Sequence, residues 1–173
     1  MDISTKNYIN ELAQRVIQVY DISIPIKNLE DVVRSMGGQI EEKIDFDDFC
    51  AGTISKEGTN GFRIVIPKTQ YPQRKTFTIA HELGHLFLHM GFRTNAFIWN
   101  MQDNMVYKRF GTSEQEYQAN EFAASLLMPK EIYCKILHKY SDHDRVDIQA
   151  VAEYFNVSIA AATNRGKFLG YIV

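Results

Sequence analysis

Two histidines and a glutamate carry the clearest chemical signal in this chain. They lie in the run His81-Glu82-Leu83-Gly84-His85. Residues four apart share one face of an α-helix and lie about 6 Å apart along its axis, so His81 and His85 can bind one metal ion. Neutral imidazole ligands suit a tetrahedral zinc ion, and Glu82 beside them can accept a proton from an attacking water. The spacing therefore predicts a hydrolytic zinc centre with Glu82 as the general base. The competing interpretation is a helix with two surface histidines and an ion-paired glutamate, which the apolar flanks of the motif disfavour.

A catalytic zinc ion needs a third protein ligand. His89 follows on nearly the same helix face, but it lies about 12 Å from His81 along the axis, too far to share one metal. We therefore expect His89 to lie behind the ligands or on the surface. The third ligand should come from another helix, and Glu116 in Glu116-Tyr117-Gln118-Ala119-Asn120 is the best candidate. Glu114, Glu121 and Asp103 are alternatives, and a capping or solvent-exposed role for Glu116 is about equally plausible from the residues alone.

The residues around Glu116 suit a helix that packs against the motif helix. Asn120 lies one turn after Glu116 and could hydrogen-bond a ligand imidazole, which would fix its tautomer. The small residues Ala119 and Ala123 would allow a close approach of the two helices. A stabilising donor for the reaction's oxyanion is also needed, and Tyr107, Arg74 and His89 are the candidates.

The elements that must position these residues follow from periodicity and from turn residues. Helical spacing predicts helices over about 5–20, from Pro25 to Gly37, over about 73–89, and from Ser113 to about Met128. Ser113 and Glu116 have capping-box spacing. A helix is expected after Pro129, and two more over 146–155 and 158–166. Strands are expected over 39–44, 50–55 and 62–66, with a hairpin turn at 58–61. The order predicts an α+β fold with N-terminal helices, a small three-stranded sheet, the motif helix packed on a second ligand helix, and a C-terminal helical pair.

Residues 91–112 have no clear period and contain several apolar side chains, namely Phe92, Phe97, Trp99, Met101, Met105, Tyr107 and Phe110. Such a segment could wall a substrate cleft or pack over the core, and the sequence favours neither. The C-terminal pair is similar to a helix-turn-helix, but its second helix is dominated by Ile159 and three alanines. Only Asn164 and Arg165 suit base contacts, so structural packing is favoured over DNA reading.

Composition excludes several classes of protein. The chain has 173 residues, 45% of them hydrophobic, and a net charge of -2, which suits one soluble domain spanning 1–173 and gives no sign of attraction to nucleic acid or membranes. Cys50 and Cys134 have no CxxC spacing and are expected to be free, buried thiols. No signal peptide or membrane span is expected, so a cytoplasmic location is predicted.

Two segments together resemble the ImmA/IrrE family of metallopeptidases. They are Arg74–His85, with the sequence RKTFTIAHELGH, and Glu116–Pro129, with the sequence EYQANEFAASLLMP. The strand Gly61–Ile66 and the segment Val151–Ser158 also fit, so the resemblance covers about residues 10–171.

The resemblance implies a zinc endopeptidase similar to the gluzincins. The leading glutamate of the family's ExxAN pattern is a ligand, which selects Glu116 beside His81 and His85, with Glu82 as base. It also implies a protein substrate, namely a helix-turn-helix repressor of a mobile element or a regulator of a stress response. A second hypothesis is a non-proteolytic zinc-containing module that binds a repressor or DNA. The presence of Glu82 favours the protease, because a binding module has no need of a base.

Overall fold

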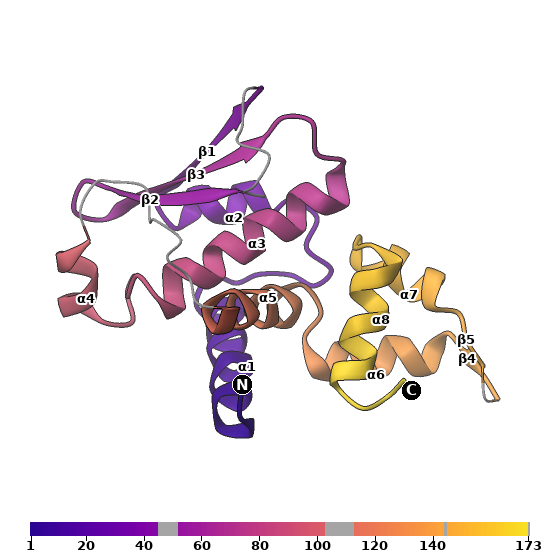
Figure 1. Cartoon of the computed structure of the whole chain (residues 1–173). Helices are drawn as coiled ribbons and strands as arrows, with labels where there is room; N and C mark the ends of the chain where they lie inside the picture. The colour runs from indigo at the N-terminus through magenta and orange to yellow at the C-terminus, as the bar shows by residue number, and fades with distance from the viewer. Residues whose placement is uncertain (45–51, 103–112, 144, 173) are drawn as a thin grey trace.

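A small sheet and two crossing helices form the centre of the molecule. The computed structural model describes residues 1–44, 52–102, 113–143 and 145–172. The sheet contains β1 (Gly38–Lys43), β2 (Thr53–Glu57) and β3 (Gly61–Pro67) in the order β1-β3-β2. The strand β3 pairs in parallel with β1 and antiparallel with β2. Helix α3 (Pro72–Leu88) lies against the sheet, and α5 (Ser113–Leu127) crosses below α3 (Figure 1). The α+β fold is confirmed.

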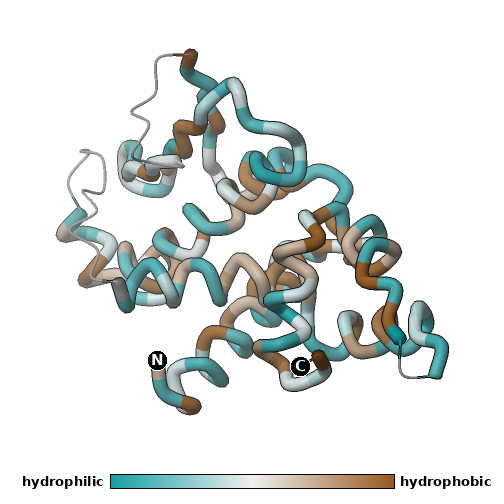
Figure 2. The backbone as a smooth tube through the Cα atoms, turned by 45° about the vertical axis from the view of Figure 1, so that its right-hand side comes forward, coloured by the Kyte–Doolittle hydropathy of each residue, from teal (hydrophilic) through white to brown (hydrophobic). Residues whose placement is uncertain are grey.

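The alternation of burial along β3 explains its central position. Phe62, Ile64 and Ile66 are fully buried, whereas the residues between them are half-buried. The helices likewise have a buried apolar face and an exposed polar face, and hydrophobic and hydrophilic residues alternate along the tube in Figure 2. The exception is α3, which is buried from Thr78 to Phe87 because the sheet and α5 cover different sides of it. The motif residues therefore lie on a core helix.

The remaining helices surround this centre. Helix α1 (Ile3–Val19) packs on α5, and α2 (Leu29–Ser35) packs beside β1 and α3. Helices α6 (Lys130–Lys139), α7 (Ile148–Phe155) and α8 (Ile159–Phe168) form a group on the other side of α5 (Figure 1). None of the helices in the described ranges combines the length and the apolar character that crossing a bilayer requires.

Several predicted boundaries were wrong for local reasons. The second helix begins at Leu29 rather than near Pro25, because the Asn28 side chain accepts hydrogen bonds from the backbone N–H groups of Glu30 and Asp31 and so caps the helix there. The second strand begins at Thr53, and residues 50 and 51 of its predicted range lie outside the described residues.

Two short elements were not predicted. Helix α4 (Ala96–Met101) follows Asn95, whose side chain accepts a hydrogen bond from Ile98 N–H. The two-residue strands β4 (Ser141–Asp142) and β5 (Arg145–Val146) pair antiparallel before α7. Both are too short to leave a period in the sequence. Cys134 is a free thiol as expected but is half-buried rather than buried, and Cys50 lies outside the described residues.

Candidate metal centre

Three side chains from α3 and α5 bring donor atoms together. Among the described residues, His81, His85 and Glu116 form a group that could hold a metal ion, with donor atoms within 4.8 Å of one another. The Nε2 atoms of His81 and His85 are 3.1 Å apart. Glu116 Oε2 lies 3.3 Å from His81 Nε2, and Glu116 Oε1 lies 3.4 Å from His85 Nε2. The two helices thus meet at one triangle of donors.

The size of this donor triangle matches a tetrahedral zinc site. With metal–ligand distances of about 2.0–2.1 Å, two tetrahedral ligands are about 3.3 Å apart. The separation of 3.1 Å between the two imidazole nitrogens is close to that value, and so are the 3.3 and 3.4 Å from each nitrogen to one of the two Glu116 oxygens. Glu116 Oε1 is buried and accepts no hydrogen bond from any residue in the described ranges. A buried carboxylate oxygen beside two imidazole nitrogens is a donor set that fits a zinc ion.

Asn120 fixes the tautomer of the first histidine. Its Oδ1 atom lies 2.9 Å from His81 Nδ1. An amide oxygen can only accept, so His81 donates from Nδ1 and keeps a lone pair on Nε2, directed at the triangle. Asn120 lies one helical turn after Glu116. The same face of α5 therefore carries both the Glu116 carboxylate and the hydrogen-bond partner of His81. The contact anticipated from the sequence is therefore present.

A relay of side chains fixes the tautomer of the second histidine. His89 Nε2 lies 3.1 Å from Gln118 Oε1 and therefore donates to it, which leaves His89 Nδ1 as an acceptor. His85 Nδ1 lies 2.9 Å from that atom and donates to it, so His85 Nε2 also keeps its lone pair. Burial lowers the pKa of His89, although the Gln118 hydrogen bond and the Glu116 charge raise it. The lowered pKa favours the neutral imidazole that this relay requires.

The Nε2 atoms of His81 and His85 face each other at 3.1 Å. His81 is 8% exposed and His85 is fully buried, so water screens electrostatic interactions poorly at this position. A cation bound here would contact both nitrogens and the Glu116 carboxylate.

Gly84 allows the two helices to come this close. A Cβ atom added to Gly84 would lie 2.9 Å from the Ala119 Cα atom and 3.0 Å from the Ala119 carbonyl oxygen. The closest approach thus involves the backbone of α5, and no side chain can rotate away to relieve it. Ala119 was expected to permit this approach, but the matching role of Gly84 was not recognised.

Glu82 is buried beside the start of β2. It is 1% exposed, and its Oε1 atom would lie 3.0 Å from a Cβ atom added to Gly52. Gly52 directly precedes β2, so the absence of a side chain there leaves room for the Glu82 carboxylate. The sequence offers only a weak signal for this role, namely a glycine within a predicted strand.

The other acidic candidates for the third ligand lie elsewhere. Glu114 accepts a hydrogen bond from Gln118 and is 3.5 Å from the N-terminal amine. Glu121 pairs with Arg165 on α8 at 2.8 Å. Asp103 lies outside the described residues. Of the three candidate carboxylates that the structure describes, Glu116 is the one that lies beside the two histidines.

The three candidates for stabilising the oxyanion lie in different surroundings. His89 lies on the Nδ1 side of His85, opposite the donor triangle. Both of its ring nitrogens are hydrogen-bonded, one to His85 and the other to Gln118. Arg74 is exposed and lines a neighbouring cavity. Tyr107 lies outside the described residues.

Part of the apolar segment after α3 packs over the core, which is one of its two anticipated roles. Phe92 and Trp99 are buried in the core, and the Trp99 indole N–H donates to the Thr59 carbonyl at 2.7 Å. Phe97 and Met101 are exposed. Met105, Tyr107 and Phe110 lie outside the described residues.

The C-terminal helical pair is fastened to the ligand helix by a buried arginine. Arg165 is 1% exposed and donates to Glu121 Oε1, to Asn10 Oδ1 and to the Met128 carbonyl. Arg165 had been considered as one of two residues suited to base contacts, but its burial makes it unavailable for them. This favours packing over DNA reading, as the sequence predicted.

Comparison with known proteins identifies the family. The model of the IrrE N-terminal-like domain, peptidase family M78, matches residues 42–167. A search of the curated proteins finds no match. Among solved structures, a Mycobacterium tuberculosis transcriptional regulator superposes with a TM-score of 0.60 at 16% sequence identity. That alignment covers 92% of this chain and 46% of the regulator, so this chain spans about half of that protein's length. At this identity the likeness concerns the fold alone. Because the family model covers most of the chain, the protein belongs to the IrrE N-terminal-like peptidases of family M78, as its resemblance to the ImmA/IrrE metallopeptidases indicated.

Proposed function

We propose that the protein is a zinc-dependent endopeptidase in which His81, His85 and Glu116 hold the metal and Glu82 is the general base. The observation that carries this proposal is the donor triangle, in which the two imidazole nitrogens are 3.1 Å apart and each lies 3.3 or 3.4 Å from one oxygen of the Glu116 carboxylate. Its dimensions suit tetrahedral zinc, and the hydrogen bonds from His81 to Asn120 and from His85 to His89 direct both imidazole lone pairs into it. Membership of a peptidase family supports peptide-bond hydrolysis as the reaction.

Each residue of the proposed site has a distinct role in peptide-bond hydrolysis. Zinc, when bound, supplies a Lewis acid that polarises the scissile carbonyl and lowers the pKa of water toward about 7. Glu82 accepts the proton of the attacking water and delivers it to the leaving amine. The buried position of Glu82 keeps bulk water from competing for that proton. Asn120 and His89 hold the two imidazoles in the neutral tautomers that a metal ligand requires.

The sheet offers a surface for an extended substrate. The strand β2 lies at one edge of the three-stranded sheet formed by the described residues. It begins just after Gly52, which adjoins Glu82. A peptide paired with the outer edge of β2 would pass alongside Glu82 in an extended conformation, which is the conformation that strand addition imposes.

We further propose that the substrate is a specific regulatory protein, namely a helix-turn-helix repressor of a mobile element or of a stress response. This part rests on the ImmA/IrrE resemblance and on family membership. We also propose that residues 1–173 act as one cytoplasmic domain, with the C-terminal pair serving as a structural part. The buried Arg165, which joins α1, α5 and α8, supports this, and direct binding to nucleic acid is not expected.

Co-incubation with a purified repressor encoded by a neighbouring gene tests the proposal. Zinc-loaded wild-type protein should cleave the repressor at one bond, which mass spectrometry of the products will identify. Glu82→Gln should abolish cleavage while keeping the zinc content, because it removes the base and no donor atom. Glu11→Gln, an exposed carboxylate on α1, is the matched control and should cleave normally. Cleavage by Glu82→Gln would overturn the mechanism.

The ligand set needs a separate measurement. His81→Ala and Glu116→Ala should each lower zinc affinity in competition with a chromogenic chelator. If Glu116→Ala kept full affinity, another carboxylate would hold the third position. Repressor binding without cleavage by the zinc-loaded wild type would favour the alternative function, a non-proteolytic binding module.

A further inference from the structure

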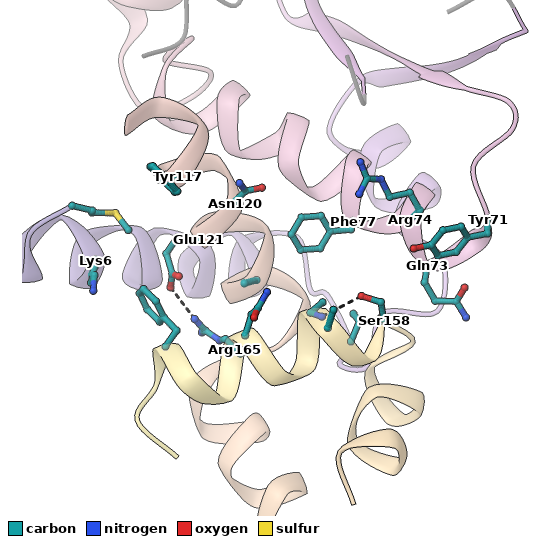
Figure 3. Close-up of a pocket in the computed structure, with 17 residues that line it drawn as sticks. Lys6, Tyr71, Gln73, Arg74, Phe77, Tyr117, Asn120, Glu121, Ser158 and Arg165 are labelled. Carbon is teal, nitrogen blue, oxygen red and sulfur yellow. Dashed lines mark hydrogen bonds and ion pairs between the residues drawn. The ribbon is translucent and has the colours of Figure 1, made fainter. Parts of the chain in front are cut away.

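A cavity lies next to the metal centre, between four helices. Its volume is about 660 Å³, and it is bordered by α1, α3, α5 and α8 (Figure 3). None of His81, Glu82, His85 and Glu116 lines it. The cavity is therefore distinct from the proposed catalytic site.

Small side chains leave this space open. Ala124 on α5 faces the cavity, and Ala160 and Ala161 face it from α8. Phe77 of α3 and Val157 supply larger apolar surface to the walls. The alanines at this point of α8 favour structural packing over DNA reading, and in the structure Ala160 and Ala161 border an open volume.

The charged side chains that line the cavity are mainly basic. Its charged side chains are Lys6, Arg74, Arg165 and Glu121. Glu121 is already paired with Arg165 at 2.8 Å, as the dashed line in Figure 3 indicates. No carboxylate of the described residues lies within ion-pair distance of Lys6 or Arg74, and the Lys6 ammonium lies 4.6 Å from the centre of the Phe168 ring. Two positive charges on the lining are therefore left without a carboxylate from the described residues.

One residue connects the cavity with the metal centre. Asn120 lines the cavity and also accepts the hydrogen bond from His81 Nδ1 at 2.9 Å. A ligand in the cavity would thus contact the residue that orients a proposed zinc ligand. The cavity lies on the Nδ1 side of His81, whereas the donor triangle is on the Nε2 side.

We propose that this cavity binds a small organic anion with an apolar body. The apolar body would contact Phe77 and the alanine-lined walls, and the anionic group would be directed toward Arg74, which lies beside Phe77 in Figure 3. The volume lies within the range of small-molecule sites, about 300–1,000 Å³, and a mostly apolar lining with a few charged groups is typical of them. A single side chain of a protein partner would leave most of this volume empty, so a free small molecule fits it better.

Fluorescence titration with 8-anilinonaphthalene-1-sulfonate, an aromatic sulfonate of this class, tests the proposal on the intact chain. Wild type should bind one equivalent with a saturable rise in emission. Ala161→Leu adds bulk on the wall and should weaken binding about tenfold or more. Ala96→Leu, at an exposed alanine on α4 outside the cavity, is the matched control and should leave binding unchanged. Unfolding midpoints will identify a variant that fails to fold, and Ala124→Leu then provides the second filled cavity.

The charge requirement is tested with a neutral dye of the same shape, N-phenyl-1-naphthylamine. Arg74→Gln should weaken binding of the sulfonate roughly two- to fivefold, as expected for an exposed charge, and leave the neutral dye unaffected. Arg15→Gln, on an exposed part of α1, should change neither.

Non-saturable binding, full binding by both filled-cavity variants, or equal affinity for the two dyes in wild type would each overturn the proposal. The titration uses no peptide substrate, so its result is independent of whether the protein cleaves a repressor.

Discussion

Substitution of Gly84 tests whether close contact between α3 and α5 builds the metal centre. Gly84→Ala should improve helix propensity by about 1 kcal/mol at an open position. In the native packing, however, the new Cβ atom would lie 2.9 Å from the Ala119 Cα atom, whereas carbon atoms in contact prefer about 3.5–4.0 Å. The helices must therefore separate or slide by about 0.6 Å or more.

The size of this displacement decides the expected effect on zinc. Metal sites tolerate changes of about 0.2 Å in ligand distances, which is smaller than the required movement. His81 and His85 belong to α3 and Glu116 to α5, so the displacement separates the two parts of the donor set. We expect zinc affinity to fall about tenfold or more, which is comparable to the loss of a hydrogen-bond partner of a metal-binding side chain.

Two measurements separate affinity from stability. Overpacking costs about 1–3 kcal/mol, so after the propensity gain the metal-free variant should lose up to about 2 kcal/mol in urea unfolding. Zinc affinity is then measured by chelator competition on the folded variant. Gln18→Ala on α1 is the control for propensity alone, because Gln18 is exposed. A gain of about 1 kcal/mol for Gly84→Ala with unchanged zinc affinity would refute the close contact and its role in the metal centre.

Three further predictions follow from the contacts around the site. Asn120→Ala should lower zinc affinity about 10- to 100-fold by releasing His81, while Asn120→Asp, which keeps an acceptor, should retain most of it; equal affinities in a chelator assay would contradict this role. Arg165→Met should cost about 3–5 kcal/mol in urea unfolding because it leaves Glu121 buried without its partner, and adding Glu121→Met should recover much of the loss; no recovery would mean that the pair is not coupled. Burial raises the pKa of Tyr133 to about 12, so the folded state holds this proton more tightly than the unfolded state. Its stabilising effect is complete below about pH 10 and should be lost by about 2 kcal/mol as the pH rises to 12, a decline that Tyr133→Phe should lack in pH-dependent unfolding.

Strong local signals explain the parts of the fold that could be predicted. The helix around His81 and the strand around Ile64 have clear periods, and the turn at Gly58 separates β2 from β3. The α+β order followed from these signals. The start of α2 was missed because Asn28 outweighs Pro25 as a start signal through two backbone hydrogen bonds. The order β1-β3-β2 could not be predicted, because β1 pairs in parallel with β3, from which β2 separates it in the sequence, and no local signal specifies such a pairing.

The candidate site was likewise predictable only in part. Helix geometry alone brought His81 and His85 together and excluded His89 as a ligand, since both results depend only on spacing along one helix. Selecting Glu116 from the neighbouring acids required the family resemblance, because any of several carboxylates on a second helix could be brought near the histidines.

Sequence by itself determined the chemical types at the site and their order on two helices. Only the tertiary structure decided how those helices meet, because their separation depends on Gly84 and the Ala119 backbone rather than on any period. It also decided that Asn120 and His89 direct the two imidazoles, since hydrogen-bond partners far apart in the chain are selected by packing. The cavity beside the site has the same origin: it is the volume that small residues on α5 and α8 leave unfilled when the buried Arg165 joins those helices.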